Sequence, residues 1–190
     1  MRKFAFIAIL FLFLFAITSS ASAALGIRGA LVLSNSNFYL EVPSFDYSET
    51  YELDLHYGIE VDASFPINPM IEILAGLTYY FPATGRELDS DTIAFMPLTV
   101  AAKFNIPGTG PLTGLNPYAG LGLNYTFWTY DPALPDPFEA GLGYFGFIGA
   151  AFGNLFGELG YTIMTATMSD GELKFESRGV YLKGGMILGI

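Results

Sequence analysis

The chain has 190 residues, of which 52% are hydrophobic and 16% aromatic, while only 14% carry a charge, against about 25% in an average soluble domain. Its 8 basic and 18 acidic residues give a formal net charge of −10, which argues against a nucleic-acid partner because the phosphate backbone requires a basic surface. The sequence has no cysteine and a single histidine, His56, which excludes disulfides, thiolate metal sites and histidine metal clusters.

The N-terminal segment has the pattern of a secretory signal peptide. Two basic residues precede an apolar run over 4–17, and the triplet Ala-Ser-Ala at 21–23 forms a cleavage site of the A-x-A type. The run is shorter than the roughly 20 residues that a spanning helix requires. We therefore predict a signal peptide at 1–23 and one mature domain at 24–190, with an uncleaved N-terminal anchor as the alternative.

The clearest secondary-structure signal lies between Tyr51 and Phe65. Every odd position of this segment is apolar, and no even position is. Alternation with a period of two is typical of a β-strand with one apolar and one polar face. The 15 residues of the segment exceed the length of a typical globular strand, about 5 to 6 residues, and suit a tilted strand that crosses a bilayer, which needs about 9–11.

Seven further segments show the same alternation with a weaker phase. They lie at 25–34, 71–81, 94–104, 119–127, 142–152, 159–167 and 180–190. Together with 51–65 they predict an all-β chain of eight strands.

The connections between these strands alternate in character. The long ones hold twelve of the 18 carboxylates and lie at 35–50, 82–92, 130–140 and 168–178. The others carry no charge and lie at 66–69, 105–117 and 153–156. This alternation predicts up-and-down hairpins with acidic loops at one end of the sheet and uncharged turns at the other. Because an open sheet edge would leave backbone groups unpaired in a bilayer, we expect an eight-stranded antiparallel transmembrane β-barrel.

One stretch carries a family resemblance. The segment Asn116 to Tyr125, NPYAGLGLNY, is similar to the P-Y-x-G-x-G-x-x-Y strand opening of the small eight-stranded outer-membrane barrels, which include the OmpA transmembrane domain, OmpX and the wider porin-like family. The resemblance covers the whole mature chain. It implies an integral protein of the bacterial outer membrane, in contact with outer-membrane lipids and inserted by the barrel-assembly machinery through its C-terminal strand. The chain ends in Ile190, where such proteins usually end in Phe or Trp.

A transmembrane helix over 140–157 is a competing interpretation. This segment has 18 residues without a charge, and its glycines at 149, 153 and 157 have the spacing of packed membrane helices. Several closely spaced glycines at 141–146 disfavour a helix by about 1 kcal/mol each. A single helix would also leave the strand at 51–65 without a partner sheet, so we predict a strand here.

The polar faces of the predicted strands define the candidate site. By strand phase, three cations, six carboxylates and one imidazole point into the barrel interior. They are Arg28, Glu52, Asp54, His56, Glu60, Asp62, Glu72, Lys103, Glu158 and Lys183. The interior of an eight-stranded barrel is just wide enough for side chains to fill, so we expect these groups to pair and plug the lumen. A narrow cation-preferring passage is the alternative, because carboxylates are in excess.

The residues favour a structural or interfacial function over catalysis. His56 has Asp54 and Gly58 as same-face neighbours and no serine in an H-x-S arrangement, so we predict no enzymatic activity and no cofactor. The acidic loops would present a negative surface to an extracellular partner that the sequence does not identify. A conduit or binding barrel for small hydrophobic molecules is the runner-up. Two neighbouring predicted strands carry aromatic residues at positions whose side chains point into the lumen, where they could shape an apolar pocket. They are Tyr118, Trp128, Phe145 and Phe147.

Overall fold

The computed structural model describes residues 26–42, 46–52, 55–81, 83–84, 92–107, 114–131, 138–168 and 174–189. The strands in these ranges are β1 (Gly26–Val42), β2 (Tyr47–Glu52), β3 (His56–Asn68), β4 (Ile71–Tyr80), β5 (Ala83–Thr84), β6 (Thr92–Asn105), β7 (Leu115–Asp131), β8 (Phe138–Phe152), β9 (Leu155–Met168) and β10 (Lys174–Gly189). Among the residues so described, no helix is long and apolar enough to cross a membrane.

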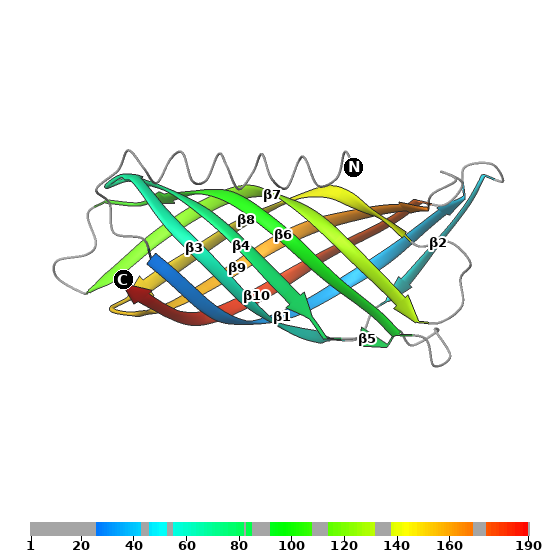
Figure 1. Cartoon of the computed structure of the whole chain (residues 1–190), viewed down its shortest axis with the longest axis horizontal. Coiled ribbons are helices and arrows are strands. Elements are labelled where there is room, and N and C mark those ends of the chain that lie inside the picture. Colours follow the sequence, from blue (N-terminus) through cyan, green and yellow to red (C-terminus); the bar gives the residue numbers. More distant parts are fainter. Residues whose placement is uncertain are drawn as a thin grey trace.

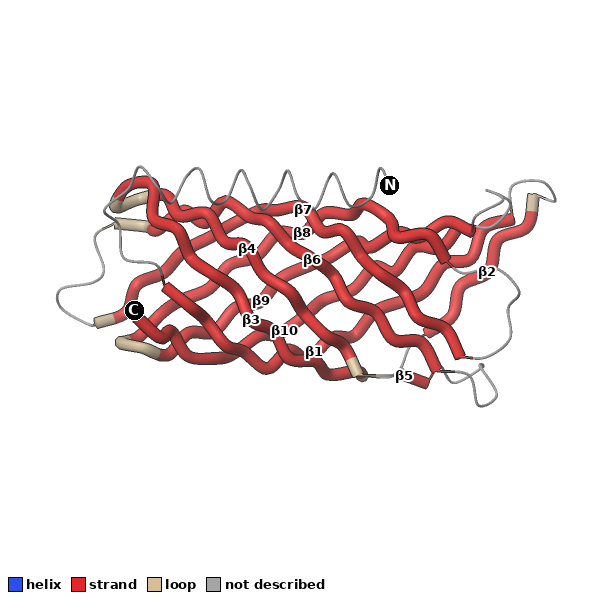
Figure 2. The backbone as a smooth tube through the Cα atoms, in the orientation of Figure 1, coloured by secondary structure: helices blue, strands red, loops and turns tan. Residues whose placement is uncertain are grey.

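Eight of these strands close into an antiparallel barrel. Pairing runs from β1 through β3, β4, β6, β7, β8 and β9 to β10, and β10 pairs back with β1 from Gly26↔Gly189 to Glu41↔Lys174. The strands cross the long axis of the molecule at a strong tilt (Figures 1 and 2). The short strand β2 pairs with β1, and β5 pairs with the start of β6, both at one end of the barrel. The predicted eight-stranded all-β barrel is confirmed.

The barrel has a polar inner face and an apolar outer face. In β3, the residues His56, Asp62 and Ser64 are buried, while the intervening Tyr57 and Val61 are 60% exposed. Exposed apolar side chains occur in the same phase on every barrel strand. A continuous apolar outer surface of this kind is typical of a barrel that faces lipid.

The strands extend past their predicted ends at the loop end of the barrel. The predicted loop at 35–50 contains the hairpin of β1 and β2, whose pairing runs from Asn37↔Glu52 to Val42↔Tyr47.

The segment 138–152 is the strand β8, so the alternative of a transmembrane helix over 140–157 is wrong. Of the glycines that disfavoured a helix there, Gly143 is buried, and a Cβ atom at this position would lie 2.5 Å from Oδ1 of the lumen residue Asn124.

The second predicted strand corresponds to two strands, β2, which ends at Glu52, and β3, which begins at His56. Ser34 of β1 lies opposite His56, and Asn37 lies opposite Glu52. Two residues separate the β1 positions and three separate the positions on the facing chain, so the facing chain carries one extra residue. A shift of one residue turns the following side chains to the opposite face. The prediction of one continuous strand over 51–65 is therefore wrong at its N-terminal end.

Tight turns close the opposite end of the barrel. The side-chain oxygen of Asn68 accepts hydrogen bonds from the N–H groups of Met70 and Ile71, at 2.8 and 2.9 Å, which is the arrangement of an Asx turn. The turn between β8 and β9 has two residues, Gly153 and Asn154. The φ angle of Gly153 is 58°, a conformation that glycine adopts at little cost and that suits a two-residue hairpin turn.

Candidate functional site

Strand pairing places each buried cation of the lumen opposite a carboxylate. Arg28 on β1 lies opposite Asp62 on β3, and Lys183 on β10 lies opposite Glu158 on β9. A third pair, Lys103 on β6 and Glu72 on β4, has the same arrangement. Directly opposite residues of antiparallel strands have Cβ atoms about 4.5–5.5 Å apart, which lets opposite charges interact. The register of the barrel strands alone therefore brings each of these cations within reach of a carboxylate.

The first two pairs join into one network. The Arg28 guanidinium places Nε 2.8 Å from Oδ1 of Asp62 and Nη2 2.8 Å from Oε1 of Glu158. Nζ of Lys183 lies 2.6 Å from Oε2 of Glu158 and 2.8 Å from Oε1 of Glu60. All five side chains are at least nine-tenths buried. In a buried site of this kind ionic contacts are strong, and removing one partner strongly destabilises the folded protein.

Neutral donors complete the hydrogen bonds of these carboxylates. The hydroxyl of Tyr118 donates to Oε1 of Glu158 at 3.1 Å, and the hydroxyl of Thr78 donates to Oε2 of Glu60 at 2.8 Å. Buried carboxylates require several donors to offset the loss of water. These contacts therefore offset part of the hydration that Glu158 and Glu60 lose on burial.

The third charge pair lies nearer the turn end of the barrel. Nζ of Lys103 is 3.0 Å from Oε2 of Glu72. The same oxygen accepts a hydrogen bond from the Ser64 hydroxyl at 2.6 Å, and Oε1 accepts one from Nδ2 of Asn105 at 2.7 Å. Glu72 is thus held by three donors from neighbouring strands.

Aromatic rings cover the three buried cations. The distances from the cationic atom to the ring centroid are 4.2 Å for Arg28 over Phe156, 4.6 Å for Lys103 over Tyr118 and 5.9 Å for Lys183 over Phe147. Positions over a ring face within about 6 Å are favourable for a cation. Aromatic residues thus fill the space around the charges that water would otherwise occupy.

Glycines on the inner wall make room for these rings. Gly120 lies opposite Phe147 in the register of β7 and β8. A Cβ atom at Gly120 would lie 2.2 Å from Cζ of Phe147, and one at Gly160 would lie 2.3 Å from Cζ of Tyr181. Such distances are far below van der Waals contact. The high glycine content of the sequence is explained in part by this packing.

His56 lies in an aromatic cluster towards the loop end of the lumen. Its ring centroid is 5.3 Å from that of Tyr80 and 5.1 Å from that of Phe95, both in edge-to-face geometry. Phe95 in turn packs on Trp128 at 5.3 Å, and the indole N–H of Trp128 donates to the carbonyl of Thr165 at 3.1 Å. Aromatic pairs at these distances pack favourably.

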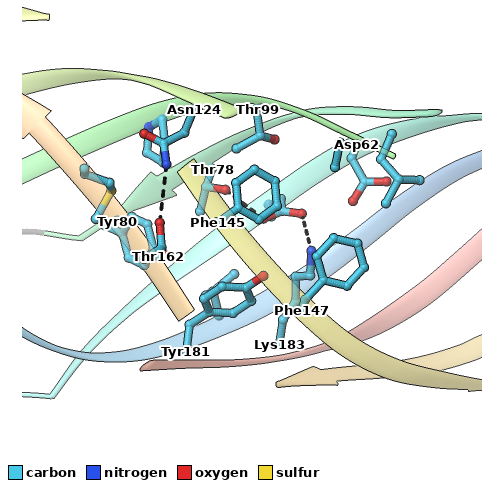
Figure 3. Close-up of a pocket in the computed structure, with 16 residues that line it drawn as sticks. Asp62, Thr78, Tyr80, Thr99, Asn124, Phe145, Phe147, Thr162, Tyr181 and Lys183 are labelled. Atoms are coloured by element: carbon cyan, nitrogen blue, oxygen red, sulfur yellow. Dashed lines mark hydrogen bonds and ion pairs between the residues drawn. The ribbon is translucent and has the colours of Figure 1, made fainter. Parts of the chain in front are cut away.

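A small cavity lies beside the charged network (Figure 3). Glu60, Asp62 and Lys183 line it together with polar and aromatic residues of other strands, among them Thr78, Tyr80, Thr99, Asn124, Phe145 and Thr162. About 40 Å³ of the cavity is open to the centres of water molecules, and one water needs about 10–15 Å³ by this measure. This part of the cavity has room for a few waters.

The structure brings together seven of the ten predicted lumen residues in ionic contacts. They are Arg28, Glu60, Asp62, Glu72, Lys103, Glu158 and Lys183. His56 is buried in the lumen, in the aromatic cluster. Asp54 lies outside the described residues.

The assignment of Glu52 to the lumen is wrong. Glu52 is exposed and lies opposite Asn37, one position beyond the buried Ser36 on β1. The side chain of Asn37 therefore points outwards, and so does that of Glu52. The cause is the extra residue between β2 and β3, which reverses the side-chain phase that holds from His56 onwards.

Sequence reasoning missed the neutral partners of the carboxylates. Ser64 and Thr78 occupy lumen-phase positions of predicted strands, so strand phase is the signal that could have found them. Tyr118 was singled out as an aromatic residue and not as a hydrogen-bond donor. Asn105 was assigned to the turn at 105–117, whereas it is the last residue of β6.

Comparisons with known proteins identify solved structures of the same fold. No protein-family model and no curated protein sequence matches the chain. It is similar to the crystal structure of the outer membrane protein OprG from Pseudomonas aeruginosa, with 16% identity, a TM-score of 0.60, and coverage of 88% of this chain and 96% of that one. It is also similar to the solid-state NMR structure of the outer membrane protein AlkL in lipid bilayers, with 12% identity, a TM-score of 0.54, and coverage of 90% and 95%.

Proposed function

We propose that this chain, which has the fold of the small outer-membrane β-barrels, is a non-enzymatic integral protein of the bacterial outer membrane with a structural or interfacial role. The observation that carries the proposal is the apolar outer face of a closed barrel. Leu31, Leu121 and Ile148 lie on different strands and are 69%, 64% and 62% exposed. Water would destabilise such a surface, and lipid would accommodate it.

The proposal includes the route to the membrane. The segment 1–23, which lies outside the described residues, acts as a signal peptide that directs export. The C-terminal strand β10 engages the barrel-assembly machinery and then closes the barrel against β1. Outer-membrane lipids are the partners of the outer face, and the acidic loops present a negative surface to the exterior.

In the proposed function the lumen is closed to solutes. The ionic network links side chains of four neighbouring strands, β9, β10, β1 and β3, and the cavity beside it has room for a few waters. A barrel of this kind supports its loops at the membrane surface and conducts no ions.

Cell fractionation tests the membrane assignment. The wild-type protein should sediment with the outer membrane and require detergent for extraction, because its outer face is apolar. Recovery of folded, monomeric protein in detergent-free buffer would contradict the proposal.

A gap in the backbone pairing between β4 and β6 favours a second candidate, a conduit or binding barrel for small hydrophobic molecules. The pairing of β4 with β6 ends at Leu77↔Leu98, and the next residue of β6 towards the loop end, Pro97, has no N–H to donate. Pro97 also lines the lumen cavity, together with Phe145 and Phe147. For this candidate, an apolar molecule from the membrane would enter between β4 and β6 at this point, and the aromatic-lined cavity would have to widen to hold it.

Uptake of a fluorescent hydrocarbon probe into proteoliposomes tests this candidate. Pro97→Val restores a backbone donor at the break and should slow uptake if molecules pass there. Pro117→Val is the matched control, because Pro117 lies on β7 opposite Ala150 in an unbroken ladder. Equal uptake by empty liposomes and by the wild type would exclude the conduit.

A further inference from the structure

Five charged side chains of the lumen form a closed ring. Going round it, Arg28 contacts Glu158, Glu158 contacts Lys183, and Lys183 contacts Glu60. Asp62 follows Glu60 two positions later on the same face of β3, both residues line the same cavity, and their carboxyl groups are close enough to share a hydrogen bond. Asp62 contacts Arg28 and completes the ring.

The ring holds two cations and three carboxylates. A ring of five with this composition must contain one contact between like charges, and that contact is the one between Glu60 and Asp62. Two carboxylates at hydrogen-bonding distance in a dry site do not both ionise at ordinary pH, because the repulsion and the lost hydration are too costly. A proton between them replaces the repulsion by a strong charge-assisted hydrogen bond.

Neighbouring groups do not supply the missing positive charge. Among the residues that the structure describes, the other charged or titratable groups that face the pair are Arg28 of β1, Tyr80 of β4, Glu158 of β9, and Tyr181 and Lys183 of β10. The two cations among them already belong to the ring. Lys103 of β6 is engaged by Glu72 of β4, and Tyr118 of β7 is a neutral donor to Glu158.

We propose that the ring binds one proton, shared between the carboxyl groups of Glu60 and Asp62, so that the buried network is neutral. One of the two groups carries the O–H and donates it to an oxygen of the other. Both residues line the lumen cavity, which has room for water beside them. Water in the cavity can therefore exchange this proton, and the ring is a proton site that responds to pH.

The direction of the response follows from the charges. At low and neutral pH the proton is bound, and the plug is held by ionic contacts and one carboxyl–carboxylate hydrogen bond. As the pH rises above about 4, where a free carboxyl group ionises, the unfolded chain releases this proton and the folded ring keeps it. The folded barrel therefore loses stability until the ring itself releases the proton and its two adjacent carboxylates repel each other. The proton site does not depend on whether solutes cross the lumen.

Infrared spectroscopy of the protein refolded in lipid vesicles at neutral pH tests the proposal. The wild type should show the C=O stretching band of a buried carboxylic acid, and the band should vanish as the pH is raised. It should be lost in Asp62→Asn and in Glu60→Gln, each of which removes one negative charge and leaves a neutral ring. It should persist in the control Glu72→Gln, because Glu72 pairs with Lys103 outside the ring.

Urea unfolding against pH gives a second readout. The unfolding midpoint of the wild type should fall from about pH 4 up to the pH at which the infrared band vanishes, and that of Asp62→Asn should stay constant over the same range. Absence of the band in the wild type would overturn the proposal even if no variant folds. So would a fall in stability at high pH that sodium or potassium salts reverse without any band, because a bound alkali cation would then neutralise the ring.

Discussion

Lys183 on β10 lies opposite Glu158 on β9, and its Nζ atom is 2.6 Å from Oε2 of that carboxylate. The preceding residue, Leu182, points away from the lumen and is 55% exposed on the outer face. One step along a single strand thus leads from a buried ion pair to the apolar outer surface.

This neighbourhood supplies a matched pair of substitutions. Lys183→Met removes a cation that contacts two carboxylates and should lower the free energy of unfolding by about 3–5 kcal/mol. Leu182→Met, a volume-conserving swap on the outer face, should cost under about 1.5 kcal/mol. Urea unfolding from lipid vesicles at neutral pH measures both. Equal costs would mean that water enters the lumen and solvates the freed carboxylates.

The outer face should tolerate charge according to depth. Val61 lies in the middle of the apolar series on β3 and is 60% exposed, so Val61→Arg should cost about 2–4 kcal/mol of barrel stability. Asn35 has the outward phase near the loop end of β1, where Asn35→Arg should cost about 0–1 kcal/mol. The same vesicle unfolding assay compares them. A mild Val61→Arg would argue against contact of this face with hydrocarbon.

The orientation of the barrel can be read with single cysteines, because the wild-type chain has none. Short turns lie on the periplasmic side of outer-membrane barrels and longer loops on the outside. Lys174→Cys, at the loop end, should therefore react with a membrane-impermeant maleimide on intact cells. Asn154→Cys, in the β8–β9 turn, should react after the cells are permeabilised. The reverse pattern would invert the topology.

The inner-wall glycines should be far less replaceable than the outer ones. Gly120→Ala places a methyl group against the ring of Phe147 and should cost about 1–3 kcal/mol through overpacking. A Cβ atom at Gly29 would meet no other atom within 4 Å, so Gly29→Ala should change stability by less than about 0.5 kcal/mol. Thermal or urea unfolding of the two variants checks the contrast, and similar costs would contradict the packing role of Gly120.

The alternation of residues predicted most of the barrel because strand phase depends on local sequence alone. The assignment of Glu60, Asp62 and Lys183 to the lumen needed no more than the count of positions along each strand. The alternation predicted the wrong face of the barrel for Glu52. One extra residue before His56 turns the side chains to the opposite face and leaves the alternation of residue types unchanged. A bulge of this kind is set by pairing with β1, which a single segment of sequence does not contain.

The pattern of contacts within the lumen depended on register between distant strands. Arg28 and Glu158 are 130 positions apart, and their contact follows from the closure of β10 on β1. The sequence indicated three cations and an excess of carboxylates, but not which carboxylates would be adjacent. The loop-end extension of β1 to Val42 was also missed, since polar residues such as Asn35 and Asn37 on its outer face resemble a loop in composition.

Single-channel recording with the purified protein, refolded and inserted into a planar lipid bilayer, tests the central claim most directly. A lumen closed by the ring of Arg28, Glu158, Lys183, Glu60 and Asp62 should give no steady conductance above that of the bare bilayer. Lys183→Met, which opens the ring, serves as the comparison and should raise the frequency of brief openings. A stable open-channel current from the wild type at neutral pH would contradict the closed lumen.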